Sequence, residues 1–306
     1  MSSDNFAIKQ QLQRIDRINI NYSVCRGLDI KPKGDGGGQR VYLSVLSIAK
    51  NEGPYIKEWI EYHKLVGIER FYFYDNDSTD NTKEILEPYI NNGTVIYHEV
   101  PGQLQMFPAY KDCISRYAAR TRWLAIIDLD EFLVPIEKDN IPEFLNDYEK
   151  FPAVGINWVL FDSNGHETKP TDHGGLISAN YTKVQKTYKD ALKGSTFIKS
   201  IVNPLNVITI ENPHHAVYKQ GLPAVTENFD AVYGPFSNFH SSAKIQINHY
   251  RTKSREEFIK RCEYGRPDSK RPKYISEGLI NFTDPAEDLA IQKFLPKLKD
   301  VMGIND

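Results

Sequence analysis

Four apolar runs of strand length alternate with segments of helical periodicity, and each run ends in polar residues. The runs are residues 41–49, 71–74, 94–100 and 123–127. Short runs rich in branched and aromatic residues are typical of strands that are buried on both faces. The alternation predicts a mainly parallel sheet with helices on both faces, so the expected fold class is α/β.

Carboxylates follow the last of these runs directly, at Asp128, Asp130 and Glu131. An unpaired charge inside a low-dielectric core is costly, so we expect these acids at the carboxyl end of the strand. The side-chain period of two should point Asp128 and Asp130 to the same side. Paired carboxylates suit a hard cation such as Mg²⁺ or Mn²⁺. An Asp-x-Asp triplet alone is weak evidence, because it occurs by chance about once in a chain of this length.

Two other strand ends also carry polar side chains. Lys50 and Glu52 follow the first run, and Asp75 and Asp77 follow the second. Because the carboxyl ends of parallel strands meet at one edge, where α/β sheets bind ligands, we expect these residues to gather there. Residues 75–80 also fit ordinary helix capping by Ser or Thr. Three acids in six residues exceed what a cap needs, and a carboxylate here can accept from a nucleobase N–H or a ribose hydroxyl.

Composition excludes several classes. The 306 residues are 40% apolar and 25% charged, with a formal net charge of −2, which is ordinary for a soluble protein without attraction to nucleic acid. No apolar run reaches the length of a membrane span, and the first residues lack the form of a signal peptide. The three cysteines, Cys25, Cys113 and Cys262, are widely spaced. We therefore expect a reducing, cytoplasmic location.

The chain is predicted to have four parts. They are an N-terminal extension with a Gly-rich linker and a short helix at 8–20 (1–40), an α/β half (41–135), a second half of the same domain (136–270) and a helical tail (271–306). Strand-like runs broken by Gly, Pro and Asn predict mixed or antiparallel structure in the second half, at 154–161, 176–186, 197–202, 207–210 and 245–250. Ser254 and Glu257 have the spacing of a capping box, which predicts a helix start.

Several motifs between residues 43 and 266 resemble those of GT-A glycosyltransferases of the family-2-like and family-92-like group. The motifs are at 47–52, 58–59, 62–63, 74–80, 123–133, 157–165, 199–202, 214–215 and 248–258. The resemblance implies a GT-A-like, Rossmann-related sheet with an acceptor-side extension. It also implies transfer of a sugar from a nucleotide-sugar, with UDP as the default nucleotide. Asp162 departs from the pattern, because relatives often carry Gly there.

The resemblance, together with the chemistry of the side chains, implies a role for each candidate. Asp128 and Asp130 would hold Mn²⁺ or Mg²⁺ on the donor diphosphate, with His249 completing the metal site, and Asp128 would also contact the donor. The other donor-binding candidates are Lys50, Glu52, Asp75, Asp77, Arg251 and Lys253. If the reaction inverts the anomer, a base must take the acceptor's proton, and the candidates are Glu131, Asp162, His166 and His215.

Other functions and partners stay open at this point. The same acids would serve a metal-dependent phosphohydrolase or nucleotidyltransferase, and a non-catalytic glycan-binding module is a further alternative. The expected acceptor is a glycan or a lipid-linked glycan. Residues 251–273 hold nine Lys or Arg against four Asp or Glu, which also suits contact with the inner face of an anionic membrane. For Arg255, Lys260 and Arg261 we expect a solvated helix face.

Overall fold

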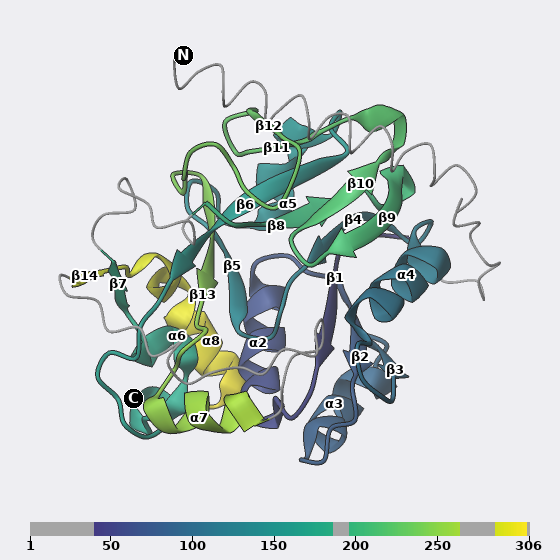
Figure 1. Cartoon of the computed structure of the whole chain (residues 1–306). Helices are drawn as coiled ribbons and strands as arrows, with labels where there is room; N and C mark the ends of the chain where they lie inside the picture. The colour runs from purple at the N-terminus through teal and green to yellow at the C-terminus, as the bar shows by residue number, and fades with distance from the viewer. Residues whose placement is uncertain (1–39, 186–195, 264–284, 305–306) are drawn as a thin grey trace.

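A ten-stranded sheet runs through the part of the chain that the computed structural model describes, namely residues 40–185, 196–263 and 285–304 (Figure 1). Its first half is parallel: β1 (Val41–Ala49), β2 (Arg70–Asp75), β3 (Val95–Glu99) and β4 (Thr121–Ile126). The connecting helices are α2 (Gly53–Leu65), α3 (Thr82–Asn91) and α4 (Met106–Tyr117). The carboxyl ends of these four strands therefore share one edge.

The second half of the sheet is mixed. Its strands are β5 (Glu131–Pro135), β6 (Ala153–Leu160), β8 (Ile198–Val202), β11 (Ala224–Val225), β12 (Ala231–Val232) and β13 (Ile245–His249). The strand order is β12-β11-β6-β8-β4-β1-β2-β3, and β13 pairs with β5 and β6. Strand β8 is antiparallel to both β4 and β6. The acid-bearing end of β4 thus lies between the parallel half and the mixed half.

Smaller elements surround this sheet. Two strand pairs lie outside it: β9 (Val207–Asn212) with β10 (His215–Tyr218), and β7 (Lys183–Gln185) with β14 (Pro285–Glu287). The remaining α-helices are α5 (Ile141–Leu145), α6 (Ile177–Asn180), α7 (Arg255–Glu263) and α8 (Leu295–Met302). Short 3-10 turns cover Asn146–Tyr148, Asp172–Gly175, Pro204–Asn206, Lys219–Gly221 and Ala290–Phe294.

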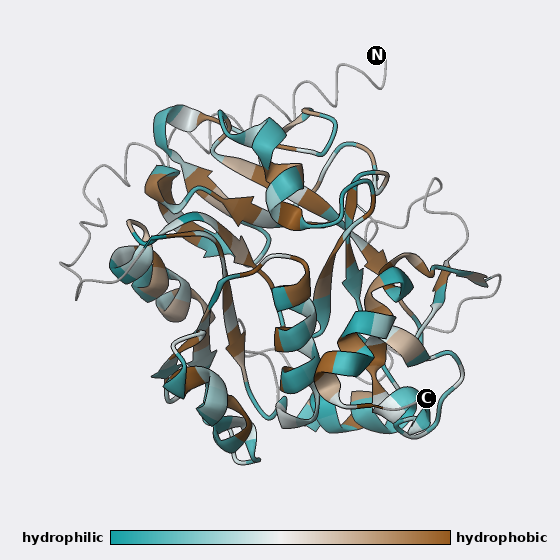
Figure 2. Cartoon of the chain, turned by 180° about the vertical axis from the view of Figure 1, so that it is seen from behind, coloured by the Kyte–Doolittle hydropathy of each residue, from teal (hydrophilic) through white to brown (hydrophobic). Residues whose placement is uncertain are grey.

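The core lies on both faces of the sheet, because alternate side chains of each strand point to opposite faces. Trp123 and Ala125 of β4 pack with α2, α3, α5 and α8 on one face. Leu124 and Ile126 pack with α4 and the β9–β10 hairpin on the other. Figure 2 shows the result: the strands are largely brown, and the helices turn teal faces outward. Burial on both faces explains why the strands read as continuous apolar runs.

The structure confirms the α/β class and the mainly parallel first half. Ser254 and Glu257 bond reciprocally, as the capping box predicts. The prediction of a strand over 176–186 holds only for β7 at Lys183–Gln185, because α6 occupies the first part of that range. In the described part of the helical tail expected over 271–306, the chain first forms β14, and the α-helix begins only at Leu295. Ser78 and Thr79 do not cap α3, whose N-cap is Asn81; Thr82 N–H instead donates to Asp80.

Some predictions fall outside the described residues, namely the Gly-rich linker, the helix at 8–20 and most of the basic segment after α7. The four-part division of the chain stays a prediction. In the ranges that the structure describes, no helix has the length and apolar content to cross a bilayer.

Gly67 offers a test of this packing. It ends α2 with a φ of +102°, and a Cβ there would lie 2.5 Å from Cδ of Pro142 at the start of α5. We expect Gly67→Ala to lower the free energy of unfolding by roughly 2–4 kcal/mol, through both backbone strain and overpacking. Gly93→Ala is the matched control, because Gly93 has a φ of +77° but no atom within 4 Å of its Cβ position. Gly93→Ala should lower the free energy of unfolding in urea by only about 1 kcal/mol. Equal losses of unfolding free energy in the two variants would contradict the packing argument.

Candidate active site

The acids after β4 lie in a tight turn. The strand ends at Ile126, and Glu131 N–H donates to the Asp128 carbonyl at 3.1 Å, so the chain reverses into β5. Asp128 and Asp130 thus lie just past the carboxyl end of the strand, as expected, but they lie in a turn, so the strand period that was expected to point them to one side does not apply. The Asp128 side chain is 30% exposed, whereas that of Asp130 is 2% exposed. The turn gives the two carboxylates different surroundings.

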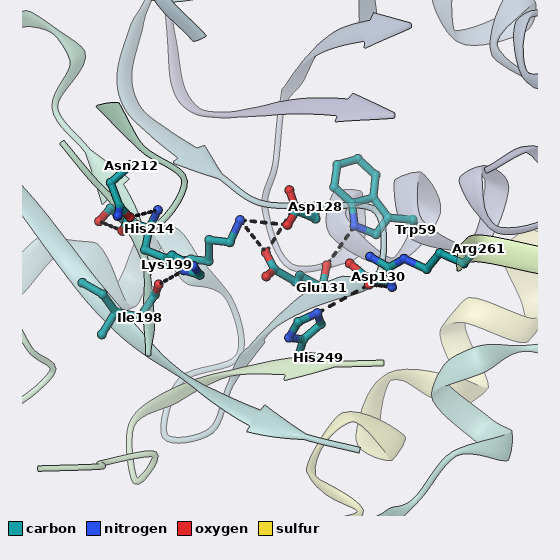
Figure 3. A network of polar contacts seen from close by, with 11 residues as sticks. Trp59, Asp128, Asp130, Glu131, Ile198, Lys199, Asn212, His214, His249 and Arg261 are labelled. Atoms are coloured by element: carbon teal, nitrogen blue, oxygen red, sulfur yellow. Dashed lines mark hydrogen bonds and ion pairs between the residues drawn. The ribbon is translucent and has the colours of Figure 1, made fainter. Parts of the chain in front are cut away.

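Each carboxylate has its own cation (Figure 3). Lys199 of β8 places Nζ 2.9 Å from Asp128 Oδ2 and 3.5 Å from Glu131 Oε2. Arg261 of α7 contacts Asp130 Oδ2, and Nε2 of His249 lies 3.4 Å from the same oxygen. The site is therefore a pair of acid–cation clusters that share the 128–131 turn.

Burial and these charges set the pKa values of the cluster. Burial would raise the pKa of Asp130, but Arg261 and His249 hold it well below its usual range. Burial raises the pKa of Glu131, with Lys199 opposing the shift. Burial would lower the pKa of Lys199, yet Asp128 and Glu131 raise it above its usual range. Asp130 and Lys199 are thus held in their charged forms.

Helix α2 fixes the backbone that carries these acids. Trp59 Nε1–H donates to the Glu131 carbonyl at 2.8 Å, and Tyr62 O–H donates to the Leu133 carbonyl at 2.9 Å. Leu133 N–H donates to Nε2 of His63 at 3.3 Å, while Nδ1 of His63 bonds the Trp59 carbonyl at 2.8 Å. The three residues are completely buried. The aromatic side of α2 therefore positions β5, and His63 is structural.

The loops after β1 and β2 are joined to each other. Oδ1 of Asn51 accepts from the backbone N–H groups of Thr79 (2.7 Å) and Asp80 (3.3 Å). Asn51 N–H donates to Ser78 Oγ, and Gly53 N–H donates to Asp80 Oδ2. The structure thus brings the 50–52 and 75–77 segments together at the carboxyl edge of the sheet.

The two aspartates after β2 differ in what they can offer to a ligand. Asp75 is buried, and its two oxygens accept from Ser78 N–H (3.0 Å) and Tyr97 O–H (2.7 Å). Asp77 is exposed, has a φ of +57°, and accepts from Gly102 N–H at 2.7 Å. Backbone strain of this kind is often found at binding sites. Asp75 therefore shapes the loop, and Asp77 faces outward from it.

Helix α7 is attached to the first half through Glu257. Its carboxylate accepts from Ser254 N–H (3.0 Å) and Tyr181 O–H (2.9 Å), and Tyr55 O–H contacts it as well. Lys253, just before the helix, has a φ of +53° and places Nζ 3.6 Å above the Tyr55 ring.

The cations before α7 also reach the first half. Lys253 Nζ lies 3.5 Å from Glu52 Oε2. The carbonyl of the half-buried Arg251 accepts a hydrogen bond from Nη1 of Arg261 at 3.0 Å. The cationic start of α7 therefore faces the loop after β1.

The other candidate bases lie in separate surroundings. Asp162 accepts from Asn164 N–H at 2.7 Å, and the His166 ring lies 3.3 Å from the Asn180 carbonyl. His215 packs edge-on to Tyr218, and burial lowers its pKa to about 4. In the described ranges none of these three has a hydrogen bond or ion pair to Asp128 or Asp130, whereas Glu131 lies inside the acidic cluster.

Sequence reasoning missed the two main cations. Lys199 is 1% exposed in the middle of an apolar strand, and a lysine interrupting such a run was the available signal. Arg261 was expected to be solvated, but its side chain is 25% exposed and contacts Asp130. Arg255 and Lys260 are exposed, at 54% and 60% of their side chains, as expected for them.

The chemistry of these residues partly fits a divalent cation. Oδ1 of Asp130, Oε1 of Glu131 and Nδ1 of His249 are buried without a hydrogen-bond partner. Oxygen and imidazole donors suit Mn²⁺. Over the described ranges, however, no group of three or more His, Cys, Asp or Glu side chains is placed to hold a metal ion. The residues fit a cation that takes part of its ligands from a bound phosphate, as Mg²⁺ often does.

The fold defines an α/β protein that carries a cluster of acids and cations at the carboxyl edge of its sheet. A sequence profile of Glycosyltransferase family 92 matches residues 44–278, and the chain belongs to this family. The resemblance to family-92-like glycosyltransferases is thereby confirmed.

Known proteins show the extent of the similarity. The chain is 26% identical over 186 residues to a family 92 protein of Oryza sativa subsp. japonica, covering 60% of this chain and 31% of the relative. It is 33% identical over 110 residues to the galactan β-1,4-galactosyltransferase GALS3 of Arabidopsis thaliana, covering 31% and 22%. The chain thus spans less than a third of these relatives.

A solved structure, S. aureus TarS 1–349 in complex with UDP, superposes with a TM-score of 0.34 at 15% identity, covering 53% of this chain and 47% of that one. A TM-score this low does not establish a shared fold.

His63 leads to a prediction about pH. Burial lowers its pKa from 6.5 to about 3, so the folded chain keeps it neutral while the unfolded chain takes up a proton below pH 6.5. This contribution to stability is present above pH 6.5 and is lost as the pH falls toward 3, by about 1.4 kcal/mol per pH unit for one group. We expect His63→Gln to flatten the fall in unfolding free energy between pH 6 and 4, measured with urea. Identical slopes in both proteins would contradict it.

Proposed function

We propose that the chain transfers a sugar from a nucleotide-sugar, most simply a UDP-sugar, to a glycan or lipid-linked glycan acceptor. The observation that carries this proposal is the gathering of Asp128, Asp130 and their cations beside the 50–52 and 75–77 loops in a family 92 domain. Membership of this family favours transfer over the phosphohydrolase and glycan-binding alternatives. A cytoplasmic location and peripheral membrane contact stay predictions.

The donor would lie along the carboxyl edge of the sheet. Asp77, with the loop that Asp75 shapes, would accept from the base or ribose, and Lys50 and Glu52 would support that end. Lys253, Arg251 and the N-terminus of α7 would face the diphosphate, where cations and helix N–H groups stabilise negative charge. Fixed charges of this kind stabilise the leaving diphosphate without having to reorganise during the reaction.

Metal dependence is part of the proposal. Asp128 and Asp130 would hold Mn²⁺ or Mg²⁺, with His249 as a further ligand, and the cation would neutralise charge on the diphosphate. The unpartnered buried oxygen of Asp130 supports this assignment. Lys199 would keep Asp128 ionised and oriented, because its Nζ lies 2.9 Å from Oδ2.

We further propose that the product anomer is inverted. Inversion needs a base for the acceptor hydroxyl, and the geometry favours Glu131 over Asp162, His166 and His215, since only Glu131 contacts the acidic cluster. Its pKa is raised by burial, as is common for catalytic bases. NMR of the product formed from an α-linked donor would give the stereochemistry directly.

Asp130→Asn tests the donor site. In the unchanged chain, UDP with Mn²⁺ at about 100 times its Kd should add about 2.7 kcal/mol of stability, which is roughly a 5 °C rise in Tm. Asn removes the charge that holds the cation, so the rise should vanish. The control is Asp300→Asn, an exposed position on α8 that should keep the full rise. A normal rise with Asp130→Asn, or a rise without metal in the unchanged chain, would overturn metal-dependent donor binding.

Arg261→Gln tests whether a cation competes with the metal. Arg261 occupies Asp130 Oδ2 in the ligand-free chain, so removing its charge should tighten the binding of Mn²⁺ alone several-fold. Electron paramagnetic resonance of free Mn²⁺ measures this affinity without nucleotide. Arg255→Gln, on the exposed side of the same helix, should leave it unchanged. Unchanged or weaker Mn²⁺ binding by Arg261→Gln would show that the ion pair does not compete with the metal.

A further inference from the structure

Four rings form a continuous, half-buried cluster beside the acids, which we call the aromatic shelf: Trp158, Phe197, His214 and Phe236. Ring centroids lie 5.3 Å apart for Trp158 and Phe197, and 4.8 Å apart both for Trp158 and His214 and for Phe197 and His214. Phe236 extends the cluster, 4.3 Å from Phe197. A group of partly exposed aromatic side chains can mark a ligand-binding surface.

The shelf adjoins both acid–cation clusters. Trp158 lies 4.3 Å from His249, whose Nε2 faces Asp130. The charge of Lys199 contributes to lowering the pKa of His214, after burial, which places that ring beside the Asp128 partner. Figure 3 shows His214 and Lys199 on the same side of the acidic turn. A molecule resting on the shelf would therefore reach the reacting end of the site.

The shelf lies on the opposite side of the acids from the proposed nucleotide end. In the sheet, β4 separates β1 and β2, which carry the 50–52 and 75–77 loops, from β8, which directly follows Phe197, and from β6, which contains Trp158. With the nucleotide on the β1–β2 side, its sugar and the acceptor would come together on the β6–β8 side. This order assigns the shelf to a sugar and not to the base.

Buried polar groups hold the shelf rigid. Asn157, 2% exposed, donates through Nδ2 to Ser237 Oγ at 2.8 Å and accepts from Ser241 N–H at 3.2 Å. Ser237 N–H also donates to the Thr196 carbonyl at 2.9 Å. The loop that carries Phe236 is thereby fixed against Phe197 before any ligand arrives, which lowers the entropy cost of binding.

One polar atom of the shelf lacks a partner. Nε1 of Trp158 is buried and makes no hydrogen bond, and a donor left in this state is costly. Nε1 itself is out of a ligand's reach, and the partly exposed rings around it, which are tilted against one another, offer apolar surface. Apolar ring surface matches the C–H face of a pyranose.

We propose that the aromatic shelf binds a pyranose ring of the glycan acceptor, with the C–H face of the sugar on the exposed parts of the rings. This inference rests on the proposed function and names the chemistry of its acceptor. The shelf would determine which acceptor sugars can bind, while the acids beside it would bind the donor.

Fluorescence of Trp158 provides a direct test. Trp59 and Trp123 are fully buried, so Trp158 is the tryptophan that a ligand can reach. With UDP and Mn²⁺ present, titration with β-1,4-galactotetraose, cellotetraose and xylotetraose should change the emission with at least one of them. Trp158→Phe should abolish the change, and Phe236→Ala at the edge of the shelf should weaken saturation-transfer NMR binding by about tenfold. Both variants should keep the affinity of the unchanged chain for UDP.

The control is Phe229→Ala. Phe229 is 46% exposed but stacks on Tyr148 at 4.9 Å, away from the shelf, so glycan binding should be unaffected. The inference is overturned if UDP binds but none of the tetrasaccharides does, or if the Phe236 and Phe229 variants lose binding equally. Loss of UDP affinity in the shelf variants would assign the shelf to the donor and also overturn it. Failure of the unchanged chain to bind UDP would instead contradict the proposed function.

Discussion

The structure depends on the neutralisation of buried acids at the turn between β4 and β5. Moving a carboxylate out of water costs several kcal/mol even after relaxation, and attraction to a cation offsets this only when the geometry is good. Asp130 and Glu131 are almost inaccessible, and their partners are Arg261 of α7 and Lys199 of β8. Without the second half of the chain, the first half would carry uncompensated charge at its ligand edge. The acids therefore couple the formation of the site to the folding of the whole domain.

Other carboxylates extend the same principle around the site. Glu58 of α2 is 4% exposed and accepts from the N–H groups of Ile177 and Ser178, so it caps α6 from a distant part of the chain. Glu257 joins α7 to the tyrosines of two other segments. The bonds of Glu58 and the contact of Glu257 with Tyr55 link α2 of the parallel half to helices of the mixed half. The irregular segments around the site are thus held by charge-assisted hydrogen bonds, which are stronger than neutral ones.

The sequence predicted the strands and their polar ends well because both signals are local. An apolar run ending in acids is complete within ten residues, and parallel pairing then brings the ends to one edge. The partners of those acids were not predictable in the same way. Lys199 is 71 residues from Asp128, and Arg261 is 131 residues from Asp130. Periodicity places Arg261 on a basic helix but gives no sign of which face meets the sheet. The turn at 128–131 was missed because the same apolar run can precede either an extended strand end or a reversal of the chain.

The pairing of acids and cations has a consequence for how the site works. Positive charges of the chain lie against one oxygen of Asp128 and one oxygen of Asp130, and so offset part of the negative charge of the proposed metal ligands. A metal ion alone would have to displace Arg261 from a carboxylate that is 2% exposed. If the metal ion binds together with a diphosphate, the negative charge of the diphosphate can pair with the displaced Arg261. If the proposed donor site is correct, the charge arrangement would favour binding of metal and nucleotide together over binding of either one alone. The ion pairs that stabilise the fold would then also make the donor site selective for the nucleotide-sugar with its metal ion.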